Sequence, residues 1–289
     1  MKKLFCFVFA ILYALLAGCT HVAETGVDLE IAAQATQVRP NDGMTMIYIP
    51  EGKFTMGMKT SETLPICEID SDSCLAARFS DEEPVHTVYL NAFWIDQTEV
   101  TNGMYASCVS AGVCPTPWYS SSYHISEYYG NPEYDAFPVM YVSWEDATLY
   151  CNWVGARLPT EAEWEKAARG IDGRIFPWGN QMPMTDLVNT FDDVNPNEVE
   201  AVGSHPAGAS PYGVLDMSGN VNEWVADWYR GNYYTIFSVR NPLGPRKGDD
   251  RVYRGGASTE EMYLRAASRN HDDPRHRNFG LGFRCAQTP

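Results

Sequence analysis

The chain has 289 residues, enough for one large domain or two small ones, and its hydrophobic content of 45% is ordinary for a globular protein. The formal net charge of −16 argues against binding of nucleic acid, whose phosphates are neutralised by Lys and Arg, and against a polybasic membrane face. Eight Trp, 17 Tyr and 18 Pro indicate an irregular, loop-rich fold held together by aromatic side chains.

The first 18 residues have the pattern of an export signal. Two lysines precede an apolar run from Leu4 to Leu16, which is too short for a membrane-spanning helix. The next residues resemble the lipobox of bacterial lipoproteins, in which the cysteine, here Cys19, becomes the lipidated first residue. Because Thr20 follows, as in lipoproteins sorted to the outer membrane, we expect a lipid-anchored protein of the bacterial cell envelope, periplasmic or surface-facing. The alternative is an ordinary secretory signal with a chance cysteine.

Residues 19–42 are polar and lack aromatic residues, and we expect them to form a flexible tether before a domain over 43–289. In that domain, alternation from Met44 to Met58 predicts a hairpin that turns at Glu51-Gly52. Residues 85–90 and 93–95 are expected to form a second strand pair.

Three helices are expected next. Thr101 is expected to cap a short helix that runs to Ala111. Residues 143–146 and 160–163 both have the spacing of a helix N-terminal box, so a helix should begin at each. After Gly170 little periodicity remains, and we expect mainly loops.

The stretch DMSGNVNEWVADW (216–228) places several carboxylate and amide oxygens within one or two turns of backbone. Hard cations such as calcium take oxygen ligands from flexible loops of this kind. The alternative is a polar turn capped by Asp216 and Asn220.

The same stretch resembles the signature of the formylglycine-generating enzyme (sulfatase-modifying factor) family. The other blocks that carry the resemblance follow in the family's order: MIYIPEGKFTMG (46–57), DEEPVHTVYLNAFWIDQTEVTNGMY (81–105), FPVMYVSWEDATLYCNWVGARLPTEAEWEKAARG (137–170), FPWGN (176–180), RVYRGGAS (251–258) and GLGFRCA (280–286). The resemblance covers roughly residues 43–288. It implies one α+β domain, a variant of the C-type-lectin-like fold that is loop-rich, with small twisted sheets and two main helices.

Enzymes of this family oxidise a substrate cysteine with copper, which two cysteines hold between a Gly-Gly dipeptide and an R-x-A-x-R segment. The corresponding residues here, 255–270, contain no cysteine. Copper(I) needs soft thiolate ligands, so we expect no copper and no formylglycine formation by the known route. A second disulfide of the vertebrate enzymes is also missing, since Ala168 and Ala266 stand at its two positions.

Six cysteines remain beyond Cys19, and export permits disulfides. Two pairs flank short loops and are expected to close them, while the third pair matches family positions that bond to each other. A metal site is the rival interpretation, but no CxxC spacing or His partner supports it. The expected disulfides are Cys67–Cys74, Cys108–Cys114 and Cys151–Cys285.

The resemblance also implies two sites for structural calcium. The remaining ligands of the first site would come from a segment of different length, in which Asp193, Asn195 and Glu198 are equal candidates. The positions that match calcium ligands are Asn189 and the carbonyl of Thr190 at the first site, and Asp216, the carbonyls of Gly219 and Val221, and Glu223 at the second.

Some lectin-like relatives change ligands by varying the segment that corresponds to residues 257–281. This is the one basic stretch of an acidic chain, so an anionic polysaccharide or acidic peptide would suit it. In the alternative interpretation its arginines and Arg284 are buried and paired with carboxylates, which we expect for Arg284 and for one of Arg265 and Arg269. The ligand-binding candidates are Tyr263, Arg269, Asn270, His271, Arg275, Arg277 and Asn278.

The sequence thus favours an envelope-anchored lipoprotein that is not catalytic as an oxidase. It would act in ligand binding or in envelope assembly, with an envelope protein, a peptide or a glycan as its partner. The alternative is a periplasmic or surface enzyme that modifies a peptide or protein by related oxidative chemistry.

Overall fold

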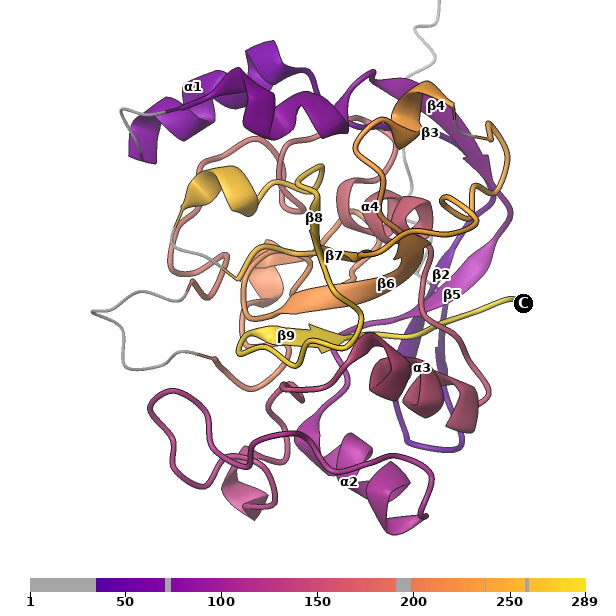
Figure 1. The fold of residues 1–289 in the computed structure, drawn as a ribbon, viewed down its shortest axis with the longest axis vertical. Helices are drawn as coiled ribbons and strands as arrows, with labels where there is room; N and C mark the ends of the chain where they lie inside the picture. The colour runs from indigo at the N-terminus through magenta and orange to yellow at the C-terminus, as the bar shows by residue number, and fades with distance from the viewer. Residues whose placement is uncertain (1–34, 71–73, 191–198, 237, 258–259) are drawn as a thin grey trace, which may run out of the picture. The chain divides into compact units, whose positions relative to one another are not determined.

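Three small β-sheets and four α-helices make up the described part of the chain, drawn in Figure 1 from a computed structural model. The structure describes residues 35–70, 74–190, 199–236, 238–257 and 260–289. The expected signal peptide, Cys19 and most of the expected tether lie outside these residues. None of the helices found within them has the length and apolarity to cross a bilayer.

The folded unit begins inside the segment that we expected to be a tether. Strand β1 (Thr36–Val38) pairs antiparallel with β2 (Thr45–Ile49). Between them Arg39, only 3% exposed, makes ion pairs of 2.6 Å with Asp42 and 2.7 Å with Asp96. The described fold therefore already includes β1 and Arg39, which precede residue 43.

Strand β2 belongs to a four-stranded sheet of order β1-β2-β5-β10, with β5 (Phe93–Asp96) and β10 (Ala286–Gln287). A separate two-stranded sheet contains β3 (Gly52–Met56) and β4 (His86–Leu90). All four expected strands exist, but both expected hairpins are wrong. The chain changes sheet after β2 and again after β4, so β2 pairs with β5 and β3 pairs with β4.

The third sheet has the order β8-β7-β6-β9 and lies at the centre of Figure 1. Its strands are β6 (Asn222–Trp228), β7 (Arg251–Arg254), β8 (Asn270–Asp272) and β9 (Leu281–Phe283). β6 runs parallel to β9 and antiparallel to β7. Most described residues after Gly170 do lie in loops, as expected, but the acidic, tryptophan-containing stretch is itself an inner strand of this sheet.

The α-helices are α1 (Thr60–Asp70), α2 (Asn102–Ser110), α3 (Trp144–Trp153) and α4 (Glu161–Arg169). The expected starts of the last three are confirmed: Thr101 caps α2, and Ser143 and Thr160 form capping boxes at α3 and α4. Helix α1 was not expected from the sequence. The short 3-10 helices are η1 (Ala76–Glu82), η2 (Pro132–Tyr134), η3 (Pro206–Gly208), η4 (Tyr233–Thr235) and η5 (Glu261–Tyr263).

Helix α4 is buried along its whole length. Its Trp164, Ala167 and Ala168 belong to the largest hydrophobic cluster, together with side chains of β2 to β7 and with Ala266. Ala168 and Ala266 are both fully buried, so the two positions of the missing disulfide are occupied by close apolar packing. Helices α2 and α3 pack in a second cluster with β6 and β9.

Candidate functional site

The three expected disulfides are confirmed. Their sulfur atoms join Cys67 to Cys74, Cys108 to Cys114, and Cys151 to Cys285. The last of these ties α3 to the residues between β9 and β10 across a sequence separation of 134. Within the described residues, every cysteine is therefore in a disulfide.

Acidic residues of α4 bind the two arginines that flank residues 255–268, the stretch that begins with the Gly-Gly dipeptide. Arg254, at the end of β7, donates to Glu161 at 3.0 Å and to Glu165 at 2.8 Å. Arg269, just before β8, donates to both oxygens of Glu161, at 2.7 and 3.1 Å. Burial acts to raise the pKa of Glu161, but the positive charges of Arg269 and Arg254 outweigh it, so the pKa lies below its usual value. The segment is thus fixed by buried ion pairs.

Asn222 is a second anchor. Its side-chain oxygen accepts from the backbone amide of Gly256 at 3.0 Å, and its own backbone amide donates to the carbonyl of Gly280 at 2.8 Å. Asn222 thereby holds together the two ends of the 257–281 segment. Asn222 belongs to the oxygen-rich stretch 216–228, for which the sequence predicts cation binding, and its role as an anchor depends on the pairing of β6 with β9, which was not foreseen.

A cavity of about 270 Å³ lies against this anchor, and we name it the Asn222 pocket. Its lining includes Tyr253, Ala257, Tyr263 and Asn270. It lies beside the residues after the Gly-Gly dipeptide, where the family resemblance would require copper-binding cysteines. Tyr253 was not among the expected site residues, since nothing in the sequence distinguishes it from a core tyrosine.

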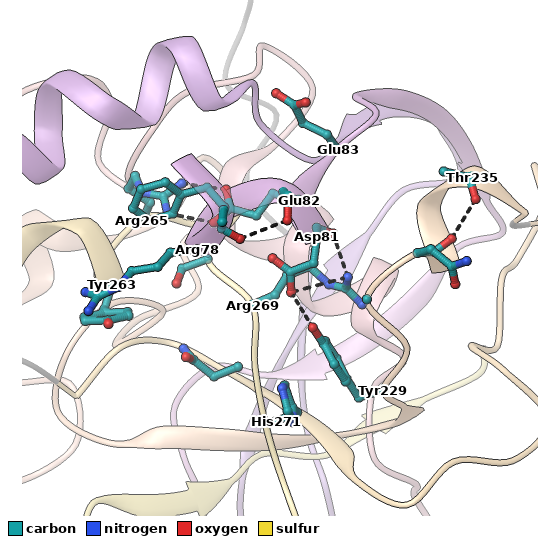
Figure 2. Close-up of a pocket in the computed structure, with 17 residues that line it drawn as sticks. Arg78, Asp81, Glu82, Glu83, Tyr229, Thr235, Tyr263, Arg265, Arg269 and His271 are labelled. Atoms are coloured by element: carbon teal, nitrogen blue, oxygen red, sulfur yellow. Dashed lines mark hydrogen bonds and ion pairs between the residues drawn. The ribbon is translucent and has the colours of Figure 1, made fainter. Parts of the chain in front are cut away.

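A larger cavity of about 720 Å³ opens between η1, the residues after β6 and the start of β8; we name it the η1 pocket (Figure 2). At its side Tyr229 stacks on His271, with ring centroids 3.7 Å apart, and donates its hydroxyl proton to Asp81 at 2.9 Å. Burial and the charge of Asp81 raise the pKa of Tyr229. Four of the expected ligand-binding residues line this pocket: Tyr263, Arg269, Asn270 and His271.

The arginines of the segment are more completely paired than we expected. Arg265 and Arg284 are 1% and 0% exposed and form ion pairs of 2.6 Å with Glu82 and Glu223. Arg269 is 7% exposed, and all three of its guanidinium nitrogens donate to protein oxygens. The expectation that one of Arg265 and Arg269 would be available to a ligand is therefore wrong. Arg269 supports the wall of the η1 pocket.

The more exposed basic residues are also paired. Because each lies beside a carboxylate, the segment does not offer a bare positive surface, and the argument for an anionic ligand loses its basis. The pairs are His271 with Asp250, Arg275 with Asp273, His276 with Asp272, and Arg277 with Asp146. The remaining three candidates, Arg275, Arg277 and Asn278, line a separate cavity.

The residues expected at the two calcium sites come together in two touching loops. The amide of Asn220 donates to the carbonyl of Asn189 at 2.9 Å. Gly219 has a φ of +80°, and a Cβ there would lie 2.2 Å from that same carbonyl oxygen, so only glycine allows this contact. Thr190 is the next residue of the first loop, whereas Asp193, Asn195 and Glu198 lie outside the described residues.

The second calcium site fits the structure in part. Glu99 is fully buried, and its Oε2 has no hydrogen-bond partner among the residues that the structure describes. Burial and then the nearby charge of Asp216 raise the pKa of Glu99 well above its usual value, so a cation beside these two carboxylates would be favourable. Glu223, by contrast, already accepts bonds from Arg284 and Trp164. The described residues contain no group of three acidic, His or Cys side chains arranged as a metal site.

Calcium binding stays a prediction, and a melting experiment tests it. We expect added calcium to raise the melting temperature of the purified protein and a chelator to lower it, because a ligand that binds only the folded state stabilises it. Asp216→Asn should reduce this response, whereas Asp273→Asn, on the exposed surface, should leave it unchanged. A melting temperature that is the same with calcium and with chelator would contradict the prediction.

The comparisons with known proteins agree with this architecture. The sequence profile of the sulfatase-modifying factor enzyme 1-like domain matches residues 32–289. The chain belongs to this family. Its domain is 31% identical to the formylglycine-generating enzyme of Streptomyces coelicolor over 86% of this chain and 90% of that protein. It is also 31% identical to the hercynine oxygenase of Mycolicibacterium smegmatis, over 91% of this chain and 64% of that protein.

A solved structure gives the same result for the fold. PvdO from Pseudomonas aeruginosa superposes with a TM-score of 0.69 and 28% sequence identity, over 89% of this chain and 98% of PvdO. The expected α+β variant of the C-type-lectin-like fold is therefore confirmed. The family includes proteins of different named activities, so the activity of this member has to be inferred from its own site.

Proposed function

We propose that this sulfatase-modifying factor domain binds a ligand in the bacterial cell envelope and does not oxidise cysteine with copper. The observation that carries the proposal is the state of its cysteines. All six beyond Cys19 are in disulfides, and none lies between residues 255 and 270. Without a thiolate pair, the Asn222 pocket lacks the soft ligands that copper(I) requires.

The construction of the site supports a binding role. The hydrogen bonds of Asn222 hold the 257–281 segment at its two ends, and buried ion pairs from α4 fix Arg254 just before it and Arg269 within it. A ligand that meets such a prearranged surface loses less binding energy to the ordering of side chains. Since the basic residues of the segment are paired, its surface offers hydrogen bonds and aromatic rings to an envelope glycan, peptide or protein.

A copper and peptide assay tests this proposal. The purified domain would be loaded with copper(I) under reducing conditions that leave its disulfides intact, and then incubated with a cysteine-containing sulfatase peptide and oxygen. We expect no copper at stoichiometry and no peptide with the loss of mass that accompanies aldehyde formation. A formylglycine-generating enzyme of the same family is the positive control. Stoichiometric copper together with aldehyde product would overturn the proposal.

The lipid anchor is part of the same proposal. The lipobox-like residues before Cys19 support a lipid on this cysteine, and Thr20 after it supports sorting to the outer membrane. We expect the intact chain in the detergent-soluble membrane fraction, and Cys19→Ala in the soluble fraction without incorporation of labelled palmitate. Equal membrane recovery of both forms would contradict a lipid on Cys19.

A second candidate function is modification of a peptide or protein by chemistry that does not need a thiolate pair. The open Asn222 pocket favours it, since two tyrosines and Asn270 line a cavity at the place that the family resemblance gives to catalysis. Elemental analysis of protein purified from its own envelope separates the two functions. A redox metal at stoichiometry would favour the enzyme.

A further inference from the structure

Exposed aromatic side chains gather beside the C-terminal half of the 257–281 segment. Trp118 and Tyr119 are 64% and 53% exposed, unusually open for such large apolar groups. Tyr119 packs edge-on against Tyr141 at 5.2 Å between ring centroids, and Tyr141 lies 6.3 Å from Phe279. Arg277 lies over the ring of Trp118 at 5.6 Å. Contiguous exposed aromatic surface of this kind marks binding sites.

The backbone holds this surface in place. The amide of Trp118 donates to the carbonyl of Tyr141, and the amide of Tyr141 donates to the carbonyl of Asn278. Three segments that are far apart in the sequence thus lie side by side. Tyr141 has a φ of +57°, and it is the one residue other than Gly, Asn or Asp with a positive φ in the part of the chain that the structure describes. Strain of this kind at a bulky residue is typical of functional sites.

Two adjoining cavities follow the aromatic surface. The first, of about 470 Å³, is lined by Trp118, Tyr119 and Tyr141 and by residues 275–279. The second, of about 280 Å³, is lined by Trp144, Trp228 and Arg251, among others. Both include Arg275 and Arg277, so the cavities meet at these two side chains. We name them together the aromatic groove.

The second cavity has a rigid wall. The guanidinium of Arg251 lies between two indole rings, 3.6 Å from the ring centroid of Trp144 and 3.5 Å from that of Trp228. Its position is fixed by a 2.5 Å hydrogen bond to the carbonyl of Ala226. The guanidinium contacts one face of each ring, so Arg251 and the two tryptophans form a single fixed wall with a polar group in it.

The charges of the groove select against a densely anionic occupant. Arg277 pairs with Asp146 at 2.9 Å, and Arg275 pairs with Asp273. The second cavity also contains Glu145, and the whole chain carries a formal charge of −16. A polyanion would have to displace these carboxylates against the net field of the protein.

We propose that the aromatic groove binds an extended polysaccharide that is uncharged or only sparsely charged. Pyranose rings present flat faces of C–H groups that pack on aromatic rings, and hydroxyl groups at their edges that bond to Arg and Asn side chains. Two cavities joined at a pair of arginines suit consecutive sugars of one chain. The inference rests on the proposed binding function and names its ligand class.

Affinity electrophoresis of the purified domain tests the inference. The probes are native gels that contain dextran, laminarin, xylan or polygalacturonate, the last as the densely charged comparison. We expect retardation in at least one of the first three gels, and roughly tenfold or greater weakening in Trp118→Ala and in Tyr119→Ala. The matched control is Tyr89→Ala, since Tyr89 also lies under an arginine, Arg240 at 4.3 Å, but on the separate β3–β4 sheet.

The result of the electrophoresis experiment can be interpreted independently of the result of the copper assay. Because both substituted residues are exposed, circular dichroism should show an unchanged fold. No retardation by any neutral polymer, retardation by polygalacturonate alone, or equal retardation of Trp118→Ala and wild type would each overturn the glycan inference. So would capture of an immobilised peptide library that is lost in Trp118→Ala, which would assign the groove to a peptide. None of these results would by itself restore copper chemistry.

Discussion

Replacing Arg284 with methionine is expected to destabilise the domain by about 3–5 kcal/mol, the usual effect of leaving a buried charge without its partner. Arg284 is fully buried and donates to both carboxylate oxygens of Glu223, at 2.6 and 2.7 Å. It also faces Glu99 and Asp216, whose charges act on it. Without it the carboxylate of Glu223 would be buried without its ion-pair partner. Urea denaturation followed by tryptophan fluorescence measures the loss.

Two variants control this experiment. Arg284→Met with Glu223→Gln should recover part of the lost stability, because the carboxylate that lost its ion-pair partner is then neutral and the glutamine can still accept from Trp164. Arg275→Met removes an arginine from an exposed ion pair with Asp273 and should leave the urea midpoint unchanged. An unchanged midpoint in Arg284→Met would contradict the structural role given to the pair.

Removal of the disulfide between Cys151 and Cys285 is expected to have the second large effect. Its sequence separation is 134, so the loop-entropy relation gives about 5 kcal/mol for replacement of both cysteines by alanine. The bond fixes α3 to the chain after β9, and both cysteines are fully buried. The free energy of unfolding, measured with urea on the oxidised proteins, gives the effect.

The disulfide between Cys108 and Cys114 is the internal control. Its sequence separation is only 6, so the same relation gives about 2 kcal/mol for its removal. The ratio of the two losses in unfolding free energy tests the loop-entropy explanation better than either loss alone, because both disulfides are removed by the same cysteine-to-alanine substitutions. A loss from the short loop that equals or exceeds the loss from the long one would show that chain entropy does not govern these bonds.

Local signals in the sequence were sufficient for the starts of α2, α3 and α4, but they missed α1 and could not give the partners of the strands. A capping box is complete within four residues, so Ser143 and Thr160 marked α3 and α4 correctly. The alternation in β2 predicts a strand but contains no information on its neighbour. The partner of β2 is β5, some 45 residues further along the chain. The side chains that pack on both strands also come from distant parts of the sequence, so no local pattern marks the pairing.

The same distinction applies to the site. The family resemblance identified the 257–281 segment and the missing thiolates, because both are properties of the residues themselves. The availability of Arg265 and Arg269 could not be predicted, since their carboxylate partners are Glu82 and Glu161, more than 100 residues earlier in the chain. The aromatic groove also went unnoticed, because Trp118, Tyr141 and Phe279 meet only in the folded chain.

The short edge strand β1 has a mechanical consequence. It lies at the edge of the first sheet, where its three residues pair with β2, and the next residue, Arg39, forms ion pairs with Asp42 and Asp96. Tension applied at the start of the folded unit would load the β1 hydrogen bonds one after another and would then meet the buried ion pairs. Since Asp96 lies on β5, beside β10, that force would pass into the first sheet. The third sheet, whose Trp228 and Arg251 line the aromatic groove, would not bear the first part of this load.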